Sequence, residues 1–216
     1  MRGPINRIII AGGGSAGWMT AAVLSQQFPE KEIALVESPD IPVIGVGEST
    51  LGTINSYLDM LNLKDEDWMK ECQATYKLGI KFTDFYKKGD AYYYPFGIKD
   101  HQNTQAGCTD WYVKKTLNPD IPTNDFYESF YSSMPFIYDN KIYDNEDGQL
   151  PNFSWKSDVA YHVDAIQFGH MLRDKVALPN GVVHVKANIV KTNIEMEGNI
   201  ESIKLDNGDE LEADLF

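Results

Sequence analysis

The chain has 216 residues, 43% of them hydrophobic, which is enough to bury the core of one large domain. It carries 32 acidic and 19 basic residues, a net charge of −13, and no cluster of Lys and Arg longer than a pair. Nucleic acids and anionic membranes attract basic surfaces, so this composition argues against both as partners. No apolar run approaches the roughly 18 residues of a membrane span, so no membrane-spanning helix is predicted. We also expect a cytoplasmic location.

The first elements place a glycine-rich turn between two strands. Residues 7–11 (RIIIA) predict a strand, residues 12–18 read GGGSAGW, and a helix is predicted over 15–28. A second strand over 32–37 ends on Glu37. This is the order and spacing of a dinucleotide-binding site. Glu37 is suited to accept hydrogen bonds from a ribose diol and to repel a 2′-phosphate, which disfavours NADP.

Each residue of the turn has a physical role in such a site. Gly12 allows a tight turn, Gly14 lets the backbone approach a pyrophosphate, and Gly17 lets the helix pack closely on the sheet. The start of the helix, at Ser15 and Ala16, offers unpaired N–H groups and a positive dipole end to the phosphates. The motif leaves open whether the dinucleotide is FAD or NAD.

The middle of the chain is less regular. A loop and two short helices are predicted over 38–53, 54–61 and 65–72. One strand is then expected over 74–82, with Lys77 and Lys81 on the same face. Residues 86–160 are irregular and aromatic, and we interpret them as an insertion. It is either a substrate-side subdomain or a set of aromatic side chains that fill a small secondary core.

The last part of the chain predicts a helix and then a β-meander. The helix spans 164–176, and the strands span 182–187 (running on to 197), 200–205 and 210–216. FAD-binding proteins often place a meander after the dinucleotide unit, so fold analogy favours FAD. The predicted fold class is α/β, a Rossmann-like FAD-binding fold of a parallel sheet with helices plus a β-meander and an aromatic-rich insertion. Because the chain ends inside an alternating strand, we expect residues 1–216 to be an incomplete, truncated FAD-binding module.

Cysteine and histidine give little sign of chemistry of their own. Cys72 and Cys108 lack CxxC spacing and a His at metal-ligand distance, so we interpret them as reduced thiols and predict no metal site. The histidines form no triad with an obvious nucleophile, and we interpret all four as structural: His101, His162, His170 and His184.

Four blocks together resemble the flavin-dependent halogenases of the tryptophan halogenase family. They are GGGSAGWM at 12–19, IGVGEST at 44–50, ATYKLGIKF at 74–82, and the pair AYHVDA and ELEADLF at 160–165 and 210–216. The resemblance extends from residue 8 to residue 216. The GVGEST loop followed by a Tyr-Lys strand is its most specific part.

The resemblance implies an activity. Members of the family use FAD as FADH2, together with O2 and a halide ion as co-substrate, to make hypohalous acid for an electron-rich, indole-like aromatic substrate. Lys77 matches the lysine that holds this oxidant, either by a hydrogen bond or as a haloamine. A separate flavin reductase is implied as the supplier of FADH2. From the residues alone Lys77 is a solvated strand lysine, whereas the resemblance predicts that Lys77 lines a buried channel while Lys81 reaches water.

The resemblance also implies contacts with the cofactor. Gly47, Glu48 and Ser49 match the strap that runs beside the flavin, and Gly45 and Gly47 permit backbone conformations that residues with side chains avoid. Val185 is expected to contact the adenosine end through its backbone.

Some features depart from the family. Val43 and Gly52 stand where an Arg and a Pro are usual, and the WxWxIP signature, the halide-binding backbone and the catalytic glutamate are not found. Two alternatives therefore stay open: another FAD-dependent monooxygenase or oxidoreductase, and a non-catalytic flavin-binding remnant.

Overall fold

The computed structural model describes two compact units. It describes residues 3–42, 45, 47–97, 104–142, 153, 154, 156 and 158–216. The first unit consists of Met1–Glu48, Tyr57–Thr75 and His162–Phe216, and the second of Ser49–Ser56 and Tyr76–Tyr161. The unit boundaries cross three short strands that pair in the order β3-β7-β4, namely β3 (Gly47–Ser49), β4 (Thr75–Lys77) and β7 (Ala160–Asp164).

A parallel sheet forms the centre of the first unit. Its strand order is β1-β2-β8, with β1 (Arg7–Ala11), β2 (Glu32–Glu37) and β8 (Val183–Lys186). At the free edge of β1, the N–H of Ile9 donates to the carbonyl of Leu215 at 3.0 Å, which starts a further parallel pairing. The predicted Rossmann-like parallel sheet is therefore confirmed.

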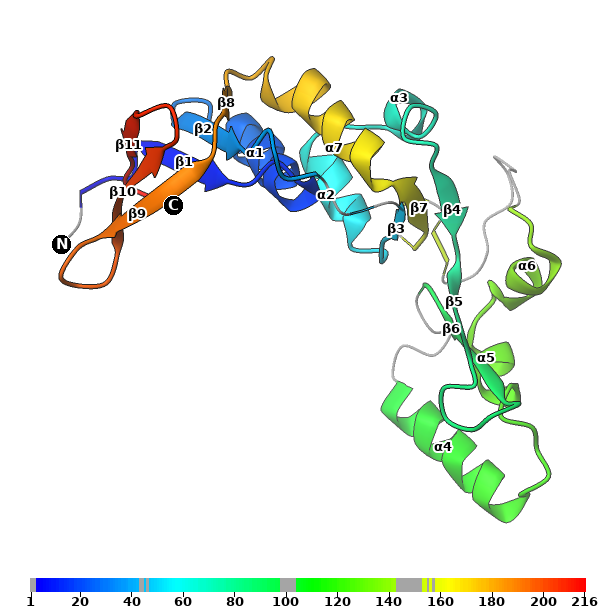
Figure 1. Ribbon diagram of the computed structural model, residues 1–216. Helices are drawn as coiled ribbons and strands as arrows, with labels where there is room; N and C mark the ends of the chain where they lie inside the picture. The colour runs from blue at the N-terminus through cyan, green and yellow to red at the C-terminus, as the bar shows by residue number, and fades with distance from the viewer. Residues whose placement is uncertain are drawn as a thin grey trace. The chain divides into compact units, whose positions relative to one another are not determined.

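Helices pack on one face of this sheet. α1 (Ser15–Gln27) lies beside α7 (Ala165–Leu172) and the π-helical turn η1 (Arg173–Ala177) that follows it (Figure 1). α1 buries Trp18, Ala21 and Ala22. The two alanines have small side chains and so allow the helix to approach the sheet closely. The short helix α2 (Ile54–Met60) occupies its predicted place, whereas α3 (Asp65–Trp68) begins where predicted and ends four residues before the predicted end at residue 72. Among the described residues, none of the helices combines the length and hydrophobicity needed to cross a membrane.

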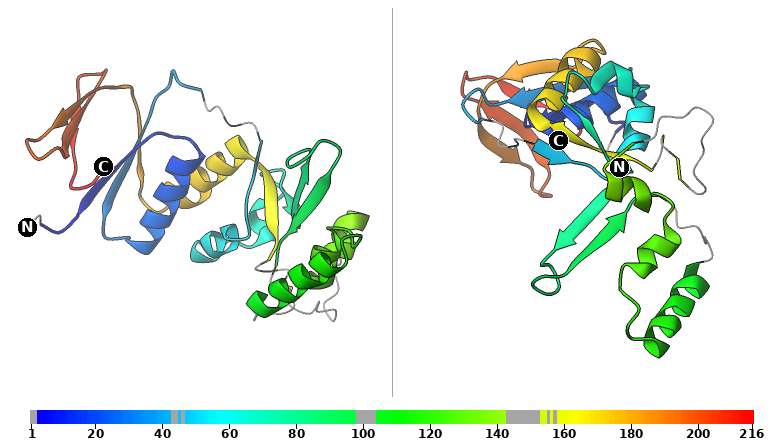
Figure 2. Two further views of the ribbon diagram at one scale, coloured as in Figure 1. Left: turned by 90° about the horizontal axis from the view of Figure 1, so that it is seen from below. Right: turned by 90° about the vertical axis from the view of Figure 1, so that its right-hand side faces the viewer.

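The opposite face of the sheet carries the β-meander (Figure 2). β9 (Ile189–Ile194), β10 (Ile200–Leu205) and β11 (Glu210–Glu212) pair antiparallel in the order β11-β10-β9. Because side chains alternate along a strand, Ile9 and Val36 face the meander and share a core with its Ile203 and Leu205, while Leu35 lies on the helix side beside Gly17. The meander predicted from the turn residues is confirmed.

Two strands predicted as continuous are divided. β8 ends at Lys186 and β9 begins at Ile189, so residues 182–197 are not one strand. Likewise β11 ends at Glu212, and Leu215 pairs with β1 in the other sheet. In both places the chain changes its hydrogen-bonding partner while keeping its alternation, and the pattern of side chains does not reveal such a change.

The second unit packs helices on a hairpin. β5 (Gly79–Thr83) and β6 (Ala91–Pro95) form the hairpin, and the helices are α4 (Thr104–Leu117), α5 (Asp125–Phe130) and α6 (Met134–Asp139) (Figure 1). Their shared core consists of Tyr127, Phe130, Tyr131 and Met134, with Tyr92, Tyr93, Trp111, Phe126 and Ile137 against it. The expectation of an irregular segment was wrong, because helices form over 104–117, 125–130 and 134–139 around this core. For these side chains the secondary-core alternative is confirmed.

The strand predicted over 74–82 is broken at Leu78. β4 and β5 belong to different sheets, so Lys77 and Lys81 lie on different strands. A Cβ at Gly79, just after the break, would lie 2.8 Å from the carbonyl oxygen of Tyr94, so only glycine fits there without a shift of the backbone.

Candidate functional site

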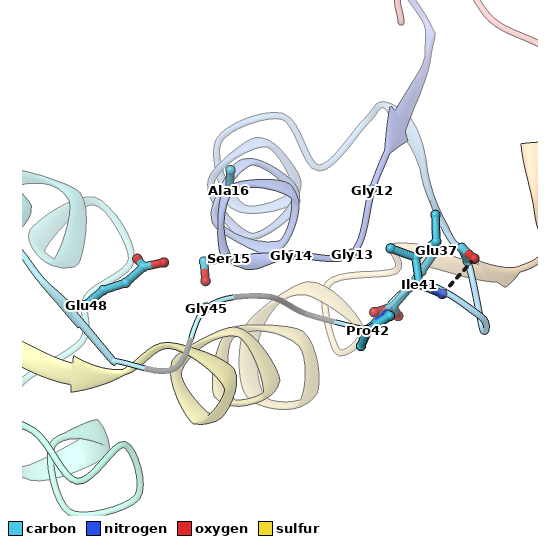
Figure 3. A pocket seen from close by; sticks show the side chains of 11 residues that line it. Gly12, Gly13, Gly14, Ser15, Ala16, Glu37, Ile41, Pro42, Gly45 and Glu48 are labelled. Atoms are coloured by element: carbon cyan, nitrogen blue, oxygen red, sulfur yellow. Dashed lines mark hydrogen bonds between the residues drawn. The ribbon is translucent and has the colours of Figure 1, made fainter.

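A pocket of about 410 Å³ opens at the glycine turn of the first unit (Figure 3). Its lining is made up of Gly12, Gly13, Gly14, Ser15, Ala16, Glu37, Ser38, Ile41, Pro42, Gly45 and Glu48. Figure 3 shows Glu37 and Glu48 at opposite ends, with the backbone from Gly13 to Ser15 between them. The site is therefore elongated, with a carboxylate at each end and backbone along the middle.

The glycines of the turn serve different purposes. Gly12 has φ +119°, in the region that favours glycine, which confirms the expected tight turn. A Cβ at Gly17 would lie 1.9 Å from the carbonyl oxygen of Gly12, so the fold itself requires glycine there. By contrast, a Cβ at Gly14 would meet no atom within 4 Å. The folded chain leaves room at Gly14, and that room is available to a ligand.

The start of α1 faces the same pocket. Gly14 precedes the helix in an extended conformation, no side chain caps the helix, and no acidic residue lies in its first turn. The first N–H groups of a helix have no partner within the helix, and the helix dipole adds partial positive charge there. This end of α1 can therefore receive an anionic group such as a phosphate.

Glu37 has a partner that the sequence did not indicate. Its carboxylate lies 2.6 Å from Nε2 of His184, and its side chain lies against Gly13. His184 is largely buried and packs edge-on against the ring of Trp18, at a centroid distance of 4.9 Å. The interpretation of His184 as structural alone was incomplete. His184 reaches Glu37 because β8 lies next to β2 in the sheet. The order of strands in a sheet cannot be derived from the spacing of residues in the sequence.

Lys77 is buried in the second unit. Only 8% of the residue is exposed, and Nζ donates to Oγ of Ser49 at 3.1 Å and to the carbonyl of Thr50 at 3.0 Å. The ring of Phe96 lies 5.2 Å from Nζ, a favourable position for a cation. Burial lowers the pKa of Lys77 below the usual value for lysine. Lys81 is exposed, so the predicted difference in exposure between the two lysines is confirmed, while the channel beside Lys77 stays a prediction.

The remaining predicted residues lie elsewhere. Gly47 begins β3, and a Cβ there would find its nearest neighbour, the Val163 carbonyl, at 3.8 Å, an ordinary contact. Val185 pairs with Val36 and packs against the meander core. Gly17, Gly47, Ser49 and Val185 are not among the pocket-lining residues, and their contacts with a cofactor stay predictions. Val43, Ile44, Val46 and His101 lie outside the described residues.

The thiols show no metal chemistry. Burial, with the nearby Glu71 carboxylate, raises the pKa of Cys72 to about 12, which keeps this thiol protonated and unreactive. Cys108 is half-buried, and both cysteines are free. In the described ranges, no three His, Cys, Asp or Glu side chains are grouped to hold a metal ion.

Comparison with known proteins places this geometry in context. A family model described as tryptophan halogenase matches residues 7–216. Tryptophan 7-halogenase RebH from Lentzea aerocolonigenes is 30% identical over 100% of this chain and 42% of its own length. The 7-chloro-L-tryptophan 6-halogenase KtzR from Kutzneria sp. (strain 744) is 32% identical over 97% of this chain and 43% of its own.

Solved protein structures are also similar to the structure of this chain. The apo structure of VirX1 matches with a TM-score of 0.87 and 42% identity. This match covers 98% of this chain and 41% of the VirX1 chain. BrvH, a flavin-dependent halogenase from Brevundimonas sp. BAL3, matches with a TM-score of 0.76 and 34% identity. This match covers 98% of this chain and 42% of the BrvH chain. The chain spans about two-fifths of the length of these relatives.

Proposed function

Because the chain belongs to the tryptophan halogenase family, we propose that it is the FAD-binding part of a flavin-dependent halogenase. The enzyme uses FADH2, O2 and a halide to make hypohalous acid, and Lys77 relays this oxidant to an electron-rich, indole-like substrate. The observation that carries the proposal is the buried Lys77, whose amine is held by the GEST segment.

The pocket of the first unit fits a dinucleotide. The room at Gly14 and the uncapped start of α1 suit a pyrophosphate, and Glu37 suits a ribose diol. With the adenosine ribose at Glu37, the flavin end extends towards Glu48, at the other end of the pocket (Figure 3). When bound, reduced FAD supplies two electrons which, with two from the halide, reduce O2 to give hypohalous acid and water.

Lys77 then acts on the oxidant. Its ammonium donates a hydrogen bond to the oxygen of hypohalous acid and so polarises the halogen. An aromatic carbon forms its bond to the halogen as the halogen–oxygen bond breaks. The oxygen takes up a proton and leaves as water, and the ring carbon loses its proton, so the proton balance is neutral. The low polarity around Lys77 strengthens this hydrogen bond relative to water.

The proposal includes a partner and a compartment. A separate flavin reductase supplies FADH2, as membership of this family implies. The two free thiols suit the reducing cytoplasm.

The test is a halogenation assay. The protein that carries these residues, in its full encoded length, is supplied with FADH2, O2, bromide and indole, and brominated indole is expected only when bromide is present. Hydroxylated indole, or NAD(P)H oxidation by the protein alone, would instead support another FAD-dependent monooxygenase or oxidoreductase. A lack of saturable quenching of FAD fluorescence would support a non-catalytic remnant.

A further inference from the structure

We infer that Ser49 is a positioning residue: with the carbonyl of Thr50, its hydroxyl holds the Lys77 ammonium as a hydrogen-bond donor and leaves one N–H for hypohalous acid. The identity of that ligand rests on the proposed function. The interaction of Ser49 with Lys77 does not, because it is a contact within this chain.

The number of donors on the amine supports this assignment. An ammonium has three N–H donors and no acceptor. Two of them are directed at Ser49 and Thr50, at 3.1 and 3.0 Å. In the part of the chain that the structure describes, the third has no oxygen or nitrogen acceptor, and the ring of Phe96 offers only the weaker attraction of its π face. Ser49 is itself an exposed residue, and its hydrogen bond to Nζ is only partly buried.

The backbone of Thr50 is held in place by hydrogen bonds to Tyr161. The N–H of Tyr161 donates to Oγ1 of Thr50 at 3.0 Å, and the N–H of Thr50 donates to the carbonyl of Tyr161 at 2.8 Å. The Tyr161 hydroxyl donates to Asn55, which in turn donates to the carbonyls of Gly52 and Val159 at 2.9 and 2.6 Å. The carbonyl that accepts from Lys77 is therefore fixed by backbone and buried amide contacts.

Neutral acceptors alone support the charge on Lys77. Among the residues that the structure describes, the partners of Nζ are the Ser49 hydroxyl, the Thr50 carbonyl and the Phe96 ring, and none is a carboxylate. The other titratable side chains of β4 and β7 in this unit are Tyr76 and Tyr161. Burial disfavours the ammonium, whereas hydrogen bonds to acceptors favour it. Of the two acceptors, only the Ser49 hydroxyl can be removed by changing a side chain.

Competitive labelling with acetic anhydride tests the inference. The labelling of Lys77 is measured by mass spectrometry across a pH series, with the exposed Lys81 as the internal reference. Loss of one hydrogen bond in Ser49→Ala should move the midpoint for Lys77 down by about half a unit to one unit. At neutral pH its labelling should then be about three- to tenfold faster. Ser49→Thr keeps the hydroxyl and should restore the wild-type midpoint.

The possible outcomes separate this inference from the proposed function. An unchanged Lys77 midpoint in Ser49→Ala, or a failure of Ser49→Thr to restore it, overturns the inference whatever the activity. If Ser49→Ala does not fold, Ser49→Cys, whose thiol is a weak acceptor, must show the same downward shift. In the halogenation assay, Ser49→Ala should be about tenfold slower when FADH2 is saturating. A wild-type protein that does not halogenate, combined with a clear shift, overturns the proposed function alone.

Discussion

The glycine turn of the first unit and the lysine site of the second are built in opposite ways. The turn presents backbone: Gly14 leaves open space and the start of α1 is uncapped. The lysine site presents one charged side chain, 8% exposed, whose contacts are with Ser49, Thr50 and Phe96. The proposed cofactor site therefore depends on backbone that no side chain covers, whereas the proposed relay site depends on a few side chains. Adding a methyl group should damage the first site, and removing a polar atom should damage the second.

The lysine site should show the largest effect. Lys77→Met removes the donor that we propose polarises hypohalous acid, and loss of one such donor typically slows a reaction by about 10²–10³-fold. Halogenation should fall by at least that factor, while quenching of FAD fluorescence should be unchanged. Lys81→Met is the matched control, because Lys81 is exposed on the neighbouring strand. Equal losses in the two variants would show that burial does not distinguish the two lysines.

Two glycines of the turn should affect different properties, Gly14 the affinity for FAD and Gly17 the stability of the fold. Gly14→Ala places its methyl group in open space, so stability should be kept, while FAD affinity should fall by about 10–100-fold because the methyl occupies ligand room. Gly17→Ala forces the turn apart, since its Cβ would lie 1.9 Å from the Gly12 carbonyl. It should lower the free energy of unfolding by about 1–3 kcal/mol or more. Denaturant unfolding and FAD titration of both variants measure the two effects.

The result for Gly14→Ala decides the role of the turn. Unchanged FAD affinity in a stable Gly14→Ala variant would mean that no ligand approaches this backbone. The glycine at position 14 would then have no explanation in either the fold or the binding.

These two sites also differ in how far the sequence predicts them. The turn could be predicted because its parts are local: a strand, glycines at fixed spacing, and Glu37 at the end of the next strand. The burial of Lys77 could not be derived from periodicity, because the strand breaks at Leu78 and the lysine is enclosed by residues distant in sequence, such as Ser49. Only the family resemblance predicted it. The contact of His184 with Glu37 depends on strand order, which no local pattern contains.

Substitutions at the Glu37 end of the pocket should have an intermediate effect on FAD binding. Glu37→Gln removes the charged acceptor for the ribose diol and should weaken FAD binding about tenfold. His184→Leu removes the group that contacts this carboxylate, and should weaken binding about threefold. The same losses should appear for ADP, which carries this ribose without the flavin. The exposed Glu32, on the same strand, supplies the control Glu32→Gln.

The comparison between FAD and ADP is the critical measurement. If Glu37→Gln weakened FAD but left ADP unaffected, Glu37 would lie at the flavin end, and the proposed direction of the dinucleotide in the pocket would be reversed.

The smallest effect concerns stability and pH. Burial lowers the pKa of Lys77 below the ordinary lysine value of 10.5, so between these two pKa values the unfolded chain binds more protons than the folded one. The free energy of unfolding contributed by Lys77 must therefore rise with pH across this interval, and its penalty is fully present only below the folded pKa. Lys77→Met lacks this dependence, so the difference in unfolding free energy, wild type minus variant, should increase as pH rises towards 10.5.

Urea unfolding across a pH series measures this difference, and Lys81→Met should run parallel to the wild type. The increase should be modest, because the two hydrogen bonds and the Phe96 ring offset part of the burial penalty. A difference that stays flat with pH would mean that Lys77 is solvated equally in the folded and unfolded chains. The contrast between an open backbone cradle and an enclosed amine would then no longer hold. A rising difference, together with the slower halogenation of Lys77→Met, would show that the fold accepts a stability cost to keep this amine out of water.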